Sequence, residues 1–114
     1  MQRKATRQSR AANAAEKRHM QWIKERCICA ACSCAALVIN HHCMGSTFRN
    51  NKILVGHWFV LGLCQSCDNL VTRGSKRALT EAFGPQSEMW LKQAEHYPEE
   101  IPLDVIQAIA QWGR

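Results

Sequence analysis

Seven cysteines are the residues with the clearest chemistry in this sequence of 114 residues. Four of them form two Cys-x-x-Cys pairs, Cys29–Cys32 and Cys64–Cys67, with 31 residues between the pairs. A tight Cys-x-x-Cys turn presents two thiolates to one ion, and tetrahedral Zn²⁺ takes four such ligands. The number of cysteines is odd and no signal-peptide pattern is seen, so disulfides are the weaker interpretation. The two pairs predict a structural zinc site.

The other cysteines leave the choice of ligands open. Cys27 and Cys34 flank the first pair, so residues 27–34 could supply a four-cysteine cluster without the second pair. An iron–sulfur cluster is an alternative cofactor, although it leaves the second pair unexplained. Cys43 is not assigned as a metal ligand, since a cysteine can also act as a small buried hydrophobic residue. The preferred zinc ligands are Cys29, Cys32, Cys64 and Cys67.

Two adjacent histidines, His41 and His42, lie within the stretch INHHCMG at 39–45. Neighbouring residues on a strand point to opposite faces, so these two imidazoles are expected to do different things. An isolated pair of this kind is usually an ordinary surface or core pair. Here the Cys-x-x-Cys pairs on either side favour a functional interpretation.

The strands and helices that must position these residues can be predicted from secondary-structure propensity and from turn residues. Two short strands are expected at 37–42 and 57–63, joined by a loop at 43–56 with glycine and asparagine turns. The zinc pairs would then clamp the ends of this hairpin. Helices are expected from near residue 13 to the first cysteines, from about 67, over 75–83, from Pro85 to about 97, and from about 102 to 112. This pattern predicts a small α+β domain.

The order of Cys pair, strand, His-His, loop, strand, Cys pair and helix resembles the HNH (His-Me finger, ββα-metal) endonucleases. It is most similar to the phage Ref-type, RecA-dependent nucleases and related phage HNH proteins. The resemblance covers about residues 27–90 and depends on HHCMG at 41–45, GHWFVLGLCQSCD at 56–68 and EAFGPQSEMW at 81–90. It implies a zinc-braced HNH domain at 27–97, between a basic N-terminal arm or helix at 1–26 and a C-terminal helix at 98–114.

The resemblance also implies roles for individual residues. His42 would be the general base that deprotonates water, and its ordinary pKa near neutrality suits that role. His41 and Asp68 would hold a catalytic Mg²⁺ or Mn²⁺ ion. The expected reaction is the hydrolysis of a DNA phosphodiester in phage or prophage recombination or DNA processing.

Three departures from the family pattern keep other functions open. Asp68 stands where the family usually has a histidine, residues 71–77 contain no further histidine, and His57 is the nearest polar residue to the family's asparagine position. The chain could therefore be a catalytically degenerate HNH scaffold that acts as a DNA-binding or recombination accessory protein. It could also be an inhibitor or adaptor of a host repair enzyme.

The charge pattern favours an anionic partner. The net charge is +6, and residues 1–26 hold eight basic residues against two acidic ones. A basic arm followed by a basic central region suits DNA, while a solvated basic surface is the plainer explanation. A host or phage recombination protein is a further candidate partner. No stretch is apolar enough to span a membrane and no signal-peptide segment is seen, so a cytoplasmic location is expected. The resemblance to phage proteins implies that this is the cytosol of a bacterial host. The predicted DNA-binding residues are Arg49, Lys52, Arg73, Lys76 and Arg77.

Overall fold

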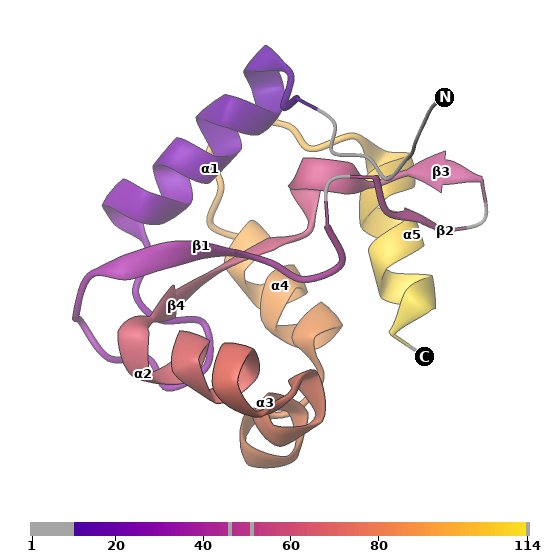
Figure 1. The fold of residues 1–114 in the computed structure, drawn as a ribbon. Coiled ribbons are helices and arrows are strands. Elements are labelled where there is room, and N and C mark those ends of the chain that lie inside the picture. Colours follow the sequence, from indigo (N-terminus) through magenta and orange to yellow (C-terminus); the bar gives the residue numbers. More distant parts are fainter. Residues whose placement is uncertain (1–10, 46, 51, 114) are drawn as a thin grey trace, which may run out of the picture.

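A two-stranded antiparallel sheet lies in the middle of the structure, with helices packed around it (Figure 1). The computed structural model describes residues 11–45, 47–50 and 52–113, and at position 76 the backbone alone. This part of the chain is an α+β fold, as the sequence predicts. Its elements are, in order, α1 (Ala14–Arg26), β1 (Val38–His42), β2 (Arg49–Asn50), β3 (Ile53–Leu54), the 3₁₀-helix η1 (Gly56–Trp58), β4 (Val60–Cys64), α2 (Gln65–Asn69), the π-helix η2 (Leu70–Gly74), α3 (Lys76–Phe83), α4 (Gln86–Ala94) and α5 (Leu103–Trp112).

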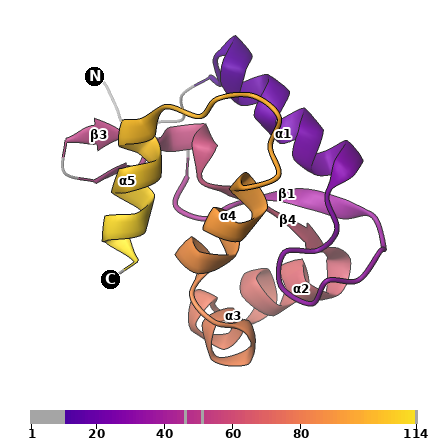
Figure 2. The same ribbon diagram turned by 180° about the vertical axis from the view of Figure 1, so that it is seen from behind.

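Helices cover the β1–β4 pair from several sides. α4 lies behind the pair in Figure 1 and in front of it in Figure 2. α1 packs against both strands and against η1, while α5 packs against α4 and the β2–β3 hairpin. α2, η2 and α3 follow directly from the end of β4. The two strands are therefore held between segments that come from both halves of the sequence.

β4 is the most buried strand, and its outer edge is covered by polar groups. The Gln93 side chain accepts from the Gly62 N–H at 2.9 Å and donates to the Val60 carbonyl at 3.0 Å. The Ala30 N–H donates to the Gly62 carbonyl at 2.8 Å. An exposed strand edge would leave these backbone groups unpaired or open to another chain. Here α4 and the cysteine-containing loop after α1 satisfy them.

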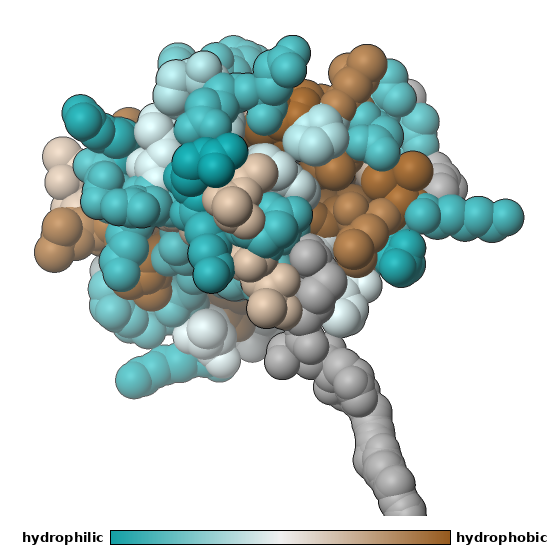
Figure 3. Space-filling model, turned by 90° about the horizontal axis from the view of Figure 1, so that it is seen from above, coloured by the Kyte–Doolittle hydropathy of each residue, from teal (hydrophilic) through white to brown (hydrophobic). Residues whose placement is uncertain are grey.

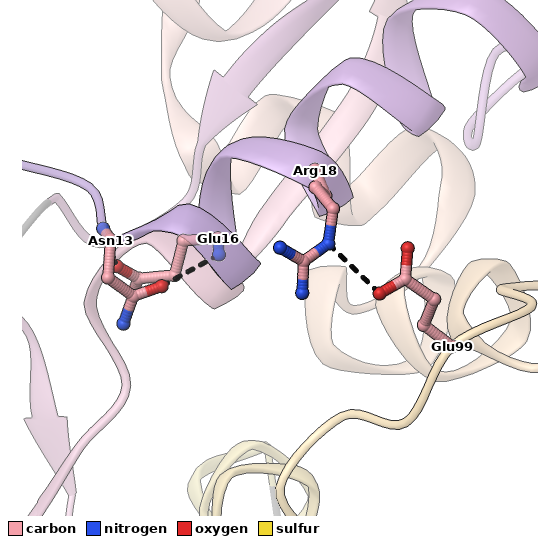
Figure 4. A network of polar contacts seen from close by, with 4 residues as sticks. All are labelled: Asn13, Glu16, Arg18 and Glu99. Carbon is pink, nitrogen blue, oxygen red and sulfur yellow. Dashed lines mark hydrogen bonds and ion pairs between the residues drawn. The ribbon is translucent and has the colours of Figure 1, made fainter.

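α1 begins where the sequence predicts, because Asn13 provides a capping box. Asn13 Oδ1 accepts from the Glu16 N–H at 2.8 Å, and the Glu16 carboxylate accepts from the Asn13 N–H at 3.0 Å (Figure 4). Such reciprocal bonds satisfy two of the free N–H groups at a helix start. Arg18 also pairs with Glu99 at 3.0 Å, in the segment between α4 and α5 (Figure 4). That exposed pair adds little stability by itself.

Substitution of Gly62 by alanine is expected to destabilise the fold by about 1–3 kcal/mol, because α1 packs closely over this position. A Cβ atom there would lie 2.8 Å from Ile23 Cγ2 and 3.2 Å from Val38 Cγ2. Chemical denaturation of Gly62→Ala against the wild type measures the loss. Gly74→Ala is the matched control, since its Cβ would meet only Ala78 Cβ at 3.7 Å. Equal stability of the Gly62→Ala variant and the wild type would contradict the close packing.

Three segments differ from the elements that the sequence predicts. Residues 56–58 form the 3₁₀-helix η1 and not the start of a strand, so β4 begins only at Val60. Neighbours on a strand point to opposite faces, but Trp58 and Phe59 are both buried, at 5% and 1% exposure. The loop at 43–56 contains the short β2–β3 hairpin, and α2 begins at Gln65. The 3₁₀ turn breaks the strand alternation, which is why both aromatic side chains reach the core.

His19 lies in the core, although the residues around it on α1 are mostly polar. It is 0% exposed, together with Ile23 on the same helix face. Its ring lies within 4.8–6.4 Å, centroid to centroid, of the rings of Trp22, Trp58, Trp90 and Tyr97. His96, after α4, is exposed.

The surface carries both polar and apolar side chains. Viewed from above, hydrophobic residues gather on the right-hand side, where the β2–β3 hairpin and α5 lie in Figure 1 (Figure 3). On α5, Leu103 is 68% and Trp112 37% exposed. None of the described helices is long and apolar enough to cross a membrane.

Candidate functional site

The two Cys-x-x-Cys pairs come together at one end of the β1–β4 sheet. Cys29 and Cys32 lie in the loop between α1 and β1, Cys64 ends β4, and Cys67 lies in the first turns of α2. Their four sulfur atoms lie within 4.8 Å of one another. This is the grouping that the sequence predicts, and it uses both pairs. The alternative cluster drawn from residues 27–34 alone is not the one that the structure forms.

The geometry of the four thiols fits a tetrahedral metal ion. Four thiolates at about 2.3 Å from one Zn²⁺ ion lie roughly 3.8 Å apart, and Cys32 Sγ lies 3.7 Å from Cys64 Sγ. All four cysteines are free of disulfides. The Cys32 N–H points at Cys29 Sγ at 3.5 Å, as in a turn that presents two sulfurs to one ion. The site could therefore hold a metal ion such as Zn²⁺.

The backbone around the thiols favours thiolates at two of them: against the opposing effect of burial, backbone hydrogen bonds lower the pKa of Cys29, and they lower the pKa of Cys64. A hydrogen bond from the backbone of Cys67 is the main reason that the pKa of Cys64 falls to about 6. Burial raises the pKa of Cys67, and it raises that of Cys27, outside the cluster, to about 11. Metal binding requires thiolates, so Cys29 and Cys64 are the thiols most ready to bind an ion.

His41 faces Asp68 across the start of α2. His41 Nδ1 lies 3.5 Å from Asp68 Oδ1, and the two side chains are 9% and 16% exposed. Asp68 follows Cys67 directly, so the thiol site and the histidine–carboxylate pair share one helix. Imidazole and carboxylate are both ligands for divalent ions such as Mn²⁺. The structure thus brings together the two residues that the sequence predicts as ligands of a second ion.

His42 points away from His41 and pairs with His57. His42 Nε2 lies 2.9 Å from His57 Nδ1, and the two rings are nearly perpendicular, at 81°. Burial lowers the pKa of His42, the charges of His57 and His41 lower it further, and Glu16 opposes them. His42 is therefore neutral at pH 7. His41 and His42 therefore have different side-chain neighbours, Asp68 and His57.

His57 is the site residue whose contact the sequence did not reveal. It belongs to η1, and its position opposite His42 depends on how η1 folds against the end of β1. The only signal in the sequence was that His57 is the nearest polar residue to the position where the HNH family has an asparagine. An imidazole N–H can donate to a ring nitrogen of a second imidazole, so this contact fixes the orientation of the His42 ring.

The predicted DNA-binding residues lie in two separate regions. Arg49 and Lys52 are exposed in the β2–β3 hairpin, beside α5 in Figure 1, while Arg73 and Arg77 are exposed near α3. Arg77 also pairs with Glu81 at 3.1 Å, which offsets part of its charge. Lys76 begins α3, but its side chain lies outside the described structure, as do residues 1–10 of the predicted basic arm. Among the described side chains, these basic residues do not form one continuous patch.

Comparison of the chain with protein-family models, with curated proteins and with solved structures finds no match in any of the three.

Proposed function

We propose that this protein is a metal-dependent DNA endonuclease of the HNH type, with a structural zinc ion at the four cysteines. The observation that carries the proposal is that the two adjacent histidines contact different side chains. His41 pairs with Asp68 and His42 with His57, on opposite sides of one strand. A hydrolase of this type needs a metal-binding group and a base close together, and the two pairs supply both.

His42 would act as the base that takes a proton from the attacking water. Its Nε2 is engaged by His57 Nδ1 at 2.9 Å, so Nδ1 of His42 is the nitrogen available to water. For Nδ1 to accept a proton, Nε2 must carry the hydrogen and donate it to His57. His57 would thus hold the His42 ring in the productive tautomer. A lowered pKa keeps His42 neutral and able to accept the proton.

His41 and Asp68 would hold the catalytic ion. Bound there, Mg²⁺ or Mn²⁺ supplies positive charge to the scissile phosphate and to the leaving 3′-oxygen. Two protein ligands are enough for such an ion, since water and phosphate oxygens complete its coordination. Asp68 replaces the usual histidine with a harder oxygen donor, which favours Mg²⁺ or Mn²⁺ over softer ions.

DNA would be held through its phosphates by Arg49, Lys52, Arg73, Lys76 and Arg77. The exposed side chains of Arg49 and Lys52 in the β2–β3 hairpin, and those of Arg73 and Arg77 in the η2–α3 segment, support contacts to two stretches of backbone. Such contacts are independent of base sequence, so binding should weaken steeply as salt is raised.

Replacement of His42 by alanine is expected to lower nicking of supercoiled plasmid by about 100-fold or more, because a positioned base contributes at least that much. The assay compares Mg²⁺, Mn²⁺ and Ni²⁺ at equal protein concentration. His96→Ala is the matched control, since His96 is exposed on the segment after α4. No nicking by the wild type in any of the three ions, or equal nicking by His42→Ala, would contradict the proposal.

A DNA-binding accessory protein that does not cleave is the second candidate. It is favoured by Asp68, because the family usually places a histidine there, and by the separation of the basic residues into two regions. In that case the wild type binds labelled duplex DNA with a salt-dependent affinity but does not cut it. The His42→Ala variant would then bind with unchanged affinity.

A further inference from the structure

A groove runs between α4 and the cysteine-containing loop after α1, which lie beside each other in Figure 2. It consists of two cavities, of about 340 Å³ and about 210 Å³. Ala30 and Ser33 of the loop and Met89 and Lys92 of α4 line both cavities, so the two are neighbouring parts of one groove. The larger cavity falls within the range of about 300–1,000 Å³ that is common for ligand sites.

Each part of the groove has an aromatic ring in its wall. Trp22 of α1 lines the larger cavity together with Ile28, and Phe83 at the end of α3 lines the smaller one. Trp22 is half-buried, and the ring of Tyr97 packs against it with 5.0 Å between centroids. Phe83 is 41% and Ile28 54% exposed. The groove therefore offers apolar and aromatic surface to a planar group in each of its two parts.

The charged side chains of the groove are mostly basic. Arg26, in the last turn of α1, and Lys92 are both exposed and line the larger cavity. Lys92 also lines the smaller cavity, so its ammonium group serves the junction between the two. Among the described side chains, Glu88 is the one carboxylate that lines either part. This arrangement suits a chain that carries negative charge between successive planar groups.

We propose that this groove binds a single strand of nucleic acid, with neighbouring bases against Trp22 and Phe83 and with phosphates at Arg26 and Lys92. A basic groove with aromatic side chains for successive bases is the general design of single-strand binding sites. The bases of a duplex stack on one another and cannot enter two such cavities. Among the described residues, none that lines the groove belongs to the histidine site, so this binding does not require cleavage.

The base sequence of the strand should matter little. Gln93 also lines the larger cavity, but its amide already accepts from the Gly62 N–H and donates to the Val60 carbonyl. It is therefore not free to read the edge of a base. Stacking on aromatic rings accepts every base.

The salt dependence of binding tests the phosphate contacts. Fluorescence anisotropy of a short labelled oligothymidylate gives the affinity as salt is raised. Arg26→Gln and Lys92→Gln are each expected to lower the slope of log affinity against log salt by about 0.7, the value for one phosphate contact of a single strand. Lys24→Gln is the matched control: Lys24 is exposed in the same last turn of α1 but lines neither cavity. Glutamine favours helix, so the three variants should fold alike.

Replacement of Phe83 by alanine tests the stacking. It is expected to weaken binding of the same oligothymidylate about tenfold, a typical loss for one stacked base. Leu37→Ala is the control, since Leu37 is 90% exposed and lies outside the groove.

Ultraviolet cross-linking of oligothymidylate to the wild type, followed by mass spectrometry, needs no variant and should locate the strand at Trp22 or Phe83. Cross-links confined to residues outside the groove would overturn the proposal, as would equal salt slopes for Arg26→Gln, Lys92→Gln and Lys24→Gln. Equal affinity for a duplex of the same length would also overturn it. Displacement of the oligonucleotide by an acidic peptide at equal concentration would assign the groove to a protein partner instead. Plasmid nicking is measured separately, so failure of single-strand binding and failure of the endonuclease remain distinguishable.

Discussion

Removal of the metal from the four-cysteine site with a chelator is expected to unfold the protein. The four thiols join the loop after α1 to the end of β4 and the start of α2, so one ion ties together segments that are far apart in the sequence. Structural zinc contributes on the order of 10 kcal/mol in zinc-finger peptides. A domain of this size has a net stability of about 5–15 kcal/mol. Loss of the ion therefore removes most or all of the stability.

Far-UV circular dichroism and thermal melting, before and after chelation, measure this effect. Re-addition of Zn²⁺ should restore the helical signal. Cys64→Ala should behave like the chelated protein, because it removes a ligand between β4 and α2. Cys43→Ala is the matched control: Cys43 is as deeply buried, at 1% exposure, but lies outside the cluster. An unchanged melt after chelation would show that the cysteines do not hold a structural ion.

The cysteine cluster could be predicted from the sequence because its geometry is mostly local. A Cys-x-x-Cys turn fixes two thiols by itself, and the predicted strands needed only to pair in order to bring the two turns together. The opposite directions of His41 and His42 follow in the same way from the alternation of a strand. His41 opposite Leu61 and His42 opposite Val60 confirm the pairing of the two strands.

The contacts that the sequence did not reveal depend on tertiary packing. The partner of His42 comes from η1, a 3₁₀ turn in a stretch whose aromatic and β-branched residues are typical of a strand. His19 lies three residues after Glu16 and four before Ile23, so one face of α1 is buried, but two of its three buried residues are polar. A hydrophobic pattern cannot show a buried face of that kind. The rings around His19 come from α1, η1, α4 and the segment after α4.

Acidification is expected to destabilise the wild type by about 3 kcal/mol through His19 alone, between pH 6.5 and pH 4. Burial lowers the pKa of His19 from 6.5 to about 4 in the folded state, and neither ring nitrogen has a hydrogen-bond partner among the described residues. Within this range the unfolded chain binds a proton that the folded chain does not. Stability therefore rises with pH, and this contribution is lost as the pH falls towards 4.

Replacement of His19 by leucine isolates this contribution. Leucine is apolar, favours helix and suits a fully buried position on α1. Denaturation at pH 7 and near pH 4 gives the difference in free energy of unfolding between variant and wild type, and this difference should shift by about 3 kcal/mol in favour of the variant in acid. Cysteine and His42 protonation act equally on both proteins and cancel. His96→Leu, at an exposed position, should show no such shift. A difference for His19→Leu that does not change with pH would mean that the His19 imidazole is protonated equally in the folded and unfolded chain.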